Sequence, residues 1–202
     1  MKLMDPVAVH LLSQVAEEDL LSLIDNLLTI IPGYDKELLD VFLSVIESHG
    51  FAKTSALEPC LKEESSWRKT VLGRWLTAQL LEQGGQFDCA IPAWNQVINN
   101  HAGPVHEAYL SRSRLHRKLG NIQDAFADLG QAVLGQQDYV FLSKAAKLLA
   151  SLRRLGEPPA VRKTRIAVLS STTTDFMAPL LQLACFRDGI DAELYVAPFG
   201  NF

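Results

Sequence analysis

The sequence predicts a mainly α-helical chain, made of paired helices, that ends in one strand–helix–strand unit. Apolar residues recur at helical spacing along most of its 202 residues, and one segment repeats at a displacement of 35 residues. After residue 163 the pattern changes to two short apolar runs on either side of a helix. We therefore predict four parts: a helical cap at 1–65, helical repeats at 66–156, a linker at 157–163 and a βαβ unit at 164–202.

The composition is that of a globular intracellular chain. Hydrophobic residues make up 48% of it and charged residues 21%, and no run approaches the roughly 20 apolar residues of a membrane span. The start of the chain also lacks the apolar core of a signal peptide. The three cysteines are far apart, and neither they nor the five histidines show metal-ligand spacing. We therefore predict a cytoplasmic protein with reduced thiols, no bound metal and no membrane association.

Charge is divided unevenly along the chain. Residues 1–65 carry 4 Lys and Arg against 12 Asp and Glu, whereas residues 66–202 carry 15 against 11. A net charge of +4 over the second part is too weak to indicate nucleic-acid binding, so we expect no nucleic-acid partner. It is compatible with an acidic protein partner.

Three helices are predicted in the first sixty residues. Asp5 is a suitable N-cap for the first, and the Pro-Gly pair at 32–33 ends the second. The third lies between Asp35, as its cap, and Gly50, at its C-terminal end. This acidic region is expected to pack as a cap on the helices that follow.

The middle of the chain contains an internal repeat. "EQGGQFDCAIPAWNQVI" at 82–98 aligns with "RKLGNIQDAFADLGQAV" at 117–133. The matched positions are Gly85, Phe87, Ala90 and Trp94 with Gly120, Ile122, Ala125 and Leu129. The repeat predicts helix pairs at 66–83 with 87–99 and at 104–119 with 121–135, followed by a single helix at 138–155. We expect the turn glycines to allow the two helices of a pair to approach closely, and Trp75, Trp94 and Tyr109 to fill the core.

These features resemble tetratricopeptide repeats over residues 70–156. Tyr109 and Ala132 occupy family-like places, whereas Arg112 and Ser113 replace the usual Leu-Gly of the first helix of a unit. The resemblance implies a superhelical array of helix pairs whose first helices line a concave groove. The fold class predicted from the sequence is therefore a tetratricopeptide-like helical hairpin array with a short C-terminal βαβ unit.

A basic strip is the predicted partner-binding site. In the helix "HEAYLSRSRLHRKLG", Arg114, Arg117 and Lys118 fall on the side opposite the apolar arc. Arg153 and Arg154 of the last helix extend this strip if the repeat register continues. The alternative interpretation is a solvated helix face with no partner.

The segment after the linker predicts a parallel βαβ unit. "RIAVLSS" and "DAELYVA" are strand-like, and Gly189 suits the left-handed position that ends the helix between them. Parallel strands are normally buried on both faces, so two strands with one helix form an incomplete layer. We therefore expect the chain to be a piece of a longer protein, cut after the first unit of an α/β domain. The open sheet also allows a homodimer.

The loop after the first strand is a candidate anion-binding site. Its residues are Ser170, Ser171, Thr172, Thr173 and Thr174. They follow a strand and precede a helix N-terminus, the position at which α/β folds bind phosphate groups. This site supports an alternative function, a phosphometabolite-binding or hydrolase-like α/β domain. The other interpretation is that the hydroxyls only cap the helix.

The last segment, "RIAVLSSTTTDFMAPLLQLACFRDGIDAELYVAPFGNF", resembles the N-terminal region of FkbH-like proteins. These belong to the haloacid dehalogenase superfamily and carry an SGNH- or flavodoxin-like N-terminal domain. The resemblance implies glyceryl transfer to an acyl carrier protein in polyketide-type biosynthesis, with Mg²⁺ and an aspartate nucleophile in a downstream domain. No DxD triplet occurs in these 202 residues, so we expect no catalytic residue and no cofactor in this chain. The predicted role is non-catalytic recognition and positioning of a carrier protein or a neighbouring enzyme.

Overall fold

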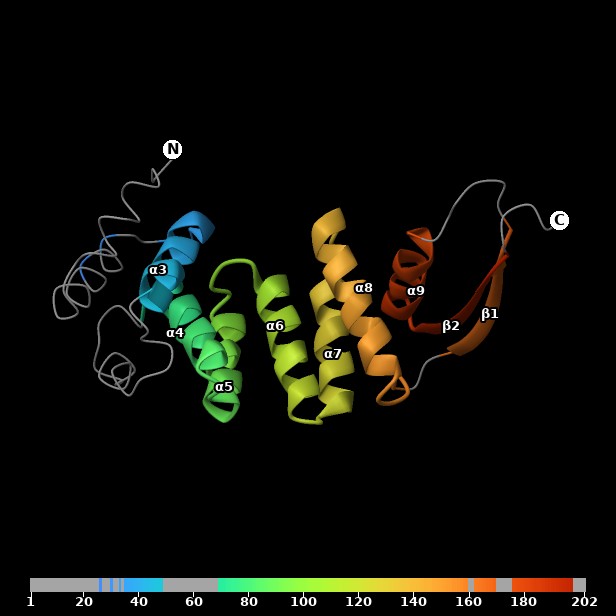
Figure 1. The fold of residues 1–202 in the computed structure, drawn as a ribbon, viewed down its shortest axis with the longest axis horizontal. Helices are drawn as coiled ribbons and strands as arrows, with labels where there is room; N and C mark the ends of the chain where they lie inside the picture. Colours follow the sequence, from blue (N-terminus) through green and yellow to red (C-terminus); the bar gives the residue numbers. More distant parts are fainter. Residues whose placement is uncertain are drawn as a thin grey trace. The chain divides into compact units, whose positions relative to one another are not determined.

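The structure is a computed structural model that describes residues 35–48, 69–159, 162–169 and 176–197, together with Asn26, Ile30 and Gly33. Within these residues the chain is mainly helical and contains a two-stranded parallel sheet (Figure 1). Contacts divide it into two compact units, Met1–Val105 and His106–Phe202, which are described separately. The division falls inside the predicted repeat region 66–156, beside the turn that precedes helix α6.

The first described helix is α3, Lys36–Ser48. Asp35 caps it as predicted, because its carboxylate accepts a hydrogen bond of 3.0 Å from the backbone N–H of Leu38. Leu39 and Phe42 are buried on one side of the helix. The third predicted helix is thus confirmed, whereas the two that precede it lie outside the described residues.

Helices α4, Val71–Gln83, and α5, Phe87–Asn99, form the first pair and match the predicted ranges except that α4 begins later. Thr70 begins α4 because its hydroxyl accepts a bond of 3.1 Å from the N–H of Gly73. Trp75 and Trp94 are buried and meet edge to face, with ring centroids 5.0 Å apart. The Trp75 indole N–H donates to the carbonyl of Ala102, so the large ring is buried without an unpaired polar group.

The second unit contains three further helices: α6, Val105–Lys118; α7, Ile122–Val133; and α8, Tyr139–Arg153. These bounds confirm the second predicted pair and the single helix after it. Figure 1 shows α6 and α7 joined by a tight turn, with α8 beside α7. The buried core of this unit includes Leu110, Phe126, Leu129, Leu149 and Leu152.

Polar contacts tie α6 to α7 at the two residues that depart from the tetratricopeptide pattern. The Arg112 guanidinium forms a bidentate ion pair with Asp128, in which its Nε lies 2.8 Å from Oδ2. The Ser113 hydroxyl donates a buried bond of 2.7 Å to the carbonyl of Ala125. The hydrogen bond with Asp128 raises the pKa of Arg112 above its ordinary value. Both departures therefore have structural roles at the interface between the two helices.

The turn glycines have a different role from the predicted one. Gly85 and Gly120 adopt φ angles of +74° and +82°, in the left-handed region that other residues rarely occupy. Apart from the glycine itself and its two chain neighbours, no heavy atom lies within 4 Å of the position that a Cβ would take at either residue. The expectation that these glycines permit close helix approach is wrong, because the backbone conformation and not the available space requires them.

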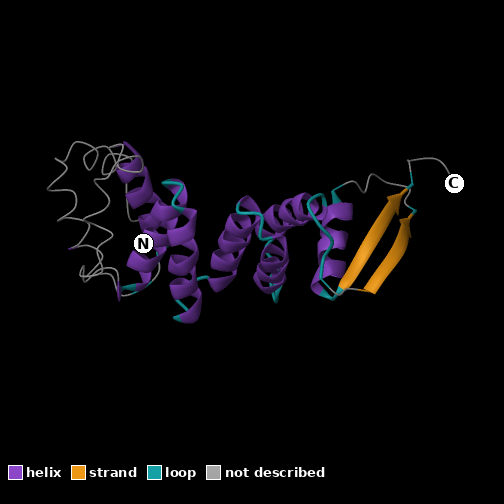
Figure 2. Cartoon of the chain, turned by 90° about the horizontal axis from the view of Figure 1, so that it is seen from below, coloured by secondary structure: helices purple, strands orange, loops and turns teal. Residues whose placement is uncertain are grey.

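The βαβ unit consists of β1, Arg162–Val168; α9, Met177–Arg187; and β2, Ile190–Val196. The strands are parallel, and their register runs from Arg162 opposite Ile190 to Val168 opposite Val196 (Figure 2). Gly189 ends α9 with a φ angle of +73°, as predicted. Helix α9 packs against β2 on one side and α8 on the other, and its Leu183 joins the core of the helices.

Candidate protein-binding site

A row of cations lies along one exposed face of α8. Lys144, Lys147 and Arg154 are exposed, and at about 100° per residue they fall within one arc of the helix. The sequence of α8 contains no Asp or Glu, so no acidic side chain of its own offsets this charge. Ser151 lies in the same arc and is half-buried.

Ser151 connects this row to α6. Its hydroxyl accepts a hydrogen bond of 2.8 Å from Nη1 of Arg117, which lies 34 residues earlier. Arg114 of α6 is half-buried, and Lys118, one turn further on, is exposed. The bond therefore places the basic side of α6 beside the basic side of α8. We call the six residues Arg114, Arg117, Lys118, Lys144, Lys147 and Arg154 the α6–α8 basic face.

Four of the five predicted partner-binding residues belong to this face, and Arg153 does not. Arg153 points toward the sheet, where its Nη2 lies 2.8 Å from Asp191 and its Nη1 donates to the carbonyl of Ala192 at 3.1 Å. Consecutive helix residues are rotated by about 100°, so Arg153 and Arg154 serve different surfaces. The repeat register alone does not reveal this difference, because the partner of Arg153 comes from a strand 38 residues later in the sequence.

Sequence analysis missed Lys144 and Lys147. The spacing of 144, 147 and 154 on a helix without acidic residues is a detectable signal. Helix α8 was predicted to end the array, and only the two arginines at its C-terminal end were assigned to the basic strip.

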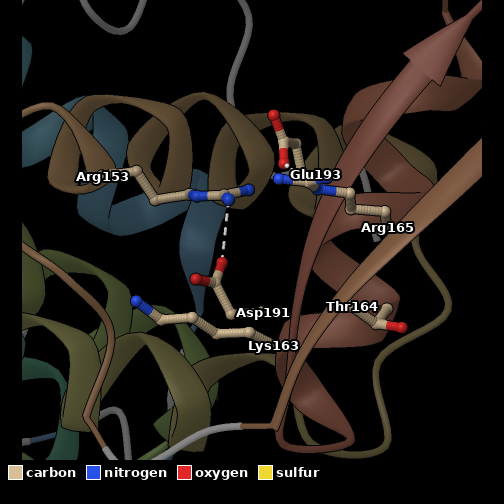
Figure 3. A pocket seen from close by; sticks show the side chains of 6 residues that line it. All are labelled: Arg153, Lys163, Thr164, Arg165, Asp191 and Glu193. Atoms are coloured by element: carbon tan, nitrogen blue, oxygen red, sulfur yellow. Dashed lines mark hydrogen bonds and ion pairs between the residues drawn. The ribbon is translucent and has the colours of Figure 1, made fainter.

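A second feature is an open depression of about 730 Å³ between the end of α8 and the sheet (Figure 3). Six residues line it: Arg153, Lys163, Thr164, Arg165, Asp191 and Glu193. Each of its cations has a carboxylate partner within this unit. Besides the pair of Arg153 with Asp191, Lys163 lies 2.9 Å from Glu157 and Arg165 lies 3.1 Å from Glu193.

Pairing limits what the depression can bind. The hydrogen bond with Glu157 raises the pKa of Lys163, so this ammonium is fully charged near neutral pH. A small anion would have to displace Asp191 from Arg153, in a pair that is largely shielded from solvent. The pairs of Lys163 and Arg165, by contrast, are exposed and therefore weak. The depression therefore favours mixed-charge protein surface over a small anionic ligand.

The predicted anion-binding loop, Ser170 to Thr174, lies outside the described residues. Among those that the structure describes, no group of three or more His, Cys, Asp or Glu side chains is arranged to hold a metal ion. In the same part of the chain no helix combines the length and apolar character needed to cross a membrane.

Fold and surface together define a mainly helical chain with a small parallel sheet and a basic helical face. Comparison with protein-family models, with curated proteins and with solved structures found no match to it.

Proposed function

We propose that this chain is a non-catalytic interaction and positioning module whose α6–α8 basic face binds an acidic protein. One observation carries the proposal: the bond between Arg117 and Ser151 joins the cations of α6 to those of α8 in a single surface. Clustered exposed cations increase the rate at which an acidic partner associates and favour it over other proteins. Binding of this kind requires no catalytic residue.

Contacts between residues about one repeat length apart support a tetratricopeptide-like array. Arg117 bonds to Ser151, and the Gln123 side chain donates to the carbonyl of Glu157 at 3.3 Å. Both pairs are 34 residues apart, which is the length of a tetratricopeptide unit. In such an array α6 and α8 are the first helices of successive units, the helices that line the groove.

The resemblance to FkbH-like proteins suggests the partner. It implies polyketide-type assembly in the cytoplasm, in which an acyl carrier protein presents the acceptor for a glyceryl unit. An acidic carrier protein, or a neighbouring enzyme with an acidic surface, matches the charge of the α6–α8 basic face. The phosphatase-type chemistry, with its Mg²⁺ and aspartate nucleophile, would belong to the downstream domain that the resemblance implies.

Titration calorimetry of the full chain with an acidic acyl carrier protein tests this function. We expect an affinity that falls as the NaCl concentration rises, because the contacts are between exposed charges. The double substitution Lys144→Glu/Lys147→Glu should weaken binding about tenfold or more. As a control, Lys36→Glu/Lys69→Glu makes the same change in charge at two exposed cations of the first unit and should leave the affinity within about twofold.

Two results would contradict the proposal. An unchanged affinity in Lys144→Glu/Lys147→Glu would remove the basic face as the binding surface. An equal loss in both double variants would show that the partner responds only to the overall charge of the chain.

A further inference from the structure

Backbone hydrogen bonds between β1 and β2 use alternate residues of each strand. Their positions determine which N–H and C=O groups remain available to bond with a further strand. Arg162 N–H donates to the carbonyl of Gly189 at 3.0 Å, and Ala197 N–H donates to that of Val168 at 3.0 Å. In a parallel pair, alternate residues of each strand bond to the partner strand. The N–H and C=O groups of 163, 165 and 167 therefore point away from β2, and those of 192, 194 and 196 point away from β1.

The outer edge of β2 is closed near its start. The carbonyl of Ala192, which points away from β1, accepts a bond from Nη1 of Arg153. The same guanidinium is held in place by its ion pair with Asp191. A further strand beside β2 would have to displace this guanidinium from both partners. Arg153 thus protects the edge in the way that covering groups protect the edges of natural sheets.

Within the part of the chain that the structure describes, the outer edge of β1 is open. Among the described residues no strand pairs with it, since the sheet contains β1 and β2 alone. The side chain of Arg165 is 91% exposed and that of Lys163 is 66% exposed. Ala167 is also exposed. An uncovered strand edge of this kind is a template for another strand.

We propose that the β1 edge binds an extended segment of a partner protein, in which acidic residues alternate with apolar ones. Lys163 and Arg165 lie on one face of β1, Arg162 precedes them on the opposite face, and β1 contains no acidic residue. Acidic side chains on the added strand would lie next to these cations on that face. Ile166 and Val168 are half-buried on the other face, so apolar residues of the segment would extend the covered side.

Charge and geometry disfavour a second copy of the chain as the occupant. Pairing of two β1 edges would place Lys163 and Arg165 of one copy against the same cations of the other, and like charges opposite one another destabilise a sheet. Pairing of β1 with the β2 edge of another copy would meet Arg153. An acidic strand from a different protein satisfies both constraints. The proposal does not depend on the α6–α8 basic face.

Hydrogen exchange measured by NMR on the full chain tests the proposal. The probe is a peptide of about eight residues in which Glu alternates with Val. We expect it to protect the amides of Lys163, Arg165 and Ala167, which point outward. The amides of Thr164 and Ile166 already bond to β2 and should change little.

Matched proline variants locate the edge. Ala167→Pro removes an outward N–H of β1 without removing a bond to β2, and it should weaken peptide binding about tenfold. Val196→Pro removes an outward N–H of β2 without removing a bond to β1, and it should leave peptide binding unchanged. Circular dichroism of both variants verifies that the helices are retained.

A charge exchange provides a test without proline. Arg165→Glu/Glu193→Arg keeps an ion pair across the strands but places the negative charge on β1. We expect this variant to prefer a peptide in which Lys alternates with Val, measured by fluorescence anisotropy. Protection of the outward amides of β2, dimerisation in analytical ultracentrifugation, or no protection at any peptide concentration would each overturn the proposal.

Discussion

Arg153, the last residue of α8, lies 2.8 Å from the carboxylate of Asp191 at the start of β2. It also donates to the carbonyl of Ala192. The pair joins the helical part of the second unit to its sheet, and both side chains are largely buried. The neighbouring Arg154 is exposed on the α6–α8 basic face. Two adjacent arginines thus have different roles, one structural and the other available to a partner.

The substitution Arg153→Ala should therefore destabilise the chain. Loss of the guanidinium leaves the Asp191 carboxylate without its partner, and we expect the free energy of unfolding to fall by about 1–2 kcal/mol. Urea unfolding followed by circular dichroism measures this change. Arg154→Ala is the matched control and should cost less than about 0.5 kcal/mol. Equal losses in the two variants would show that the ion pair contributes nothing.

Asp128 is buried between Arg112 and His116, and its replacement by Asn should cost about 2 kcal/mol. The substitution keeps the size of the side chain but leaves the Arg112 guanidinium beside a neutral group. Asp124→Asn changes the same charge on the exposed side of α7 and should cost less than about 0.5 kcal/mol. Unfolding midpoints of the two variants in urea make the comparison, and similar midpoints would contradict the assigned role of Asp128.

Two glycines near the ends of one helix should respond in opposite ways to alanine. Gly120→Ala forces a side chain into the left-handed region, so we expect a loss of about 1 kcal/mol. Gly130 lies inside α7 with nothing within 4 Å of a Cβ, so Gly130→Ala should stabilise by about 0.5–1 kcal/mol. Thermal unfolding of both variants decides the matter. A loss in Gly130→Ala would show that the site is not open.

The hydrogen bond from Arg187 lowers the pKa of the Asp188 carboxyl at the end of α9. A lowered folded-state pKa contributes stability above the unfolded pKa, and this contribution is lost as the pH falls through the folded value. Titration of Asp188 by NMR should give a pKa below the ordinary range, and Arg187→Gln should raise it. A value that does not move in Arg187→Gln would assign the shift to another cause. Both groups are exposed, so we expect little effect on unfolding.

Helix positions were predictable because they depend on local patterns. Asp35 and the turn glycines mark helix ends through their own backbone preferences, and the periodic apolar residues identify the buried faces. The parallel βαβ unit was equally clear from two apolar runs around a helix. The basic face was predicted only in part: the predicted strip included Arg154 but not Lys144 and Lys147, although α8 contains no Asp or Glu.

The sequence by itself determined where the helices and strands lie, since helical period, caps and left-handed glycines act over a few residues. Only the tertiary structure decided which arginine serves which purpose. Arg112 pairs with Asp128, Arg117 bonds to Ser151 and Arg153 pairs with Asp191. These partners lie 16, 34 and 38 residues away, so their choice depends on how helices and strands pack. A charged side chain is directed by the groups that packing brings within its reach, and no local pattern contains that information.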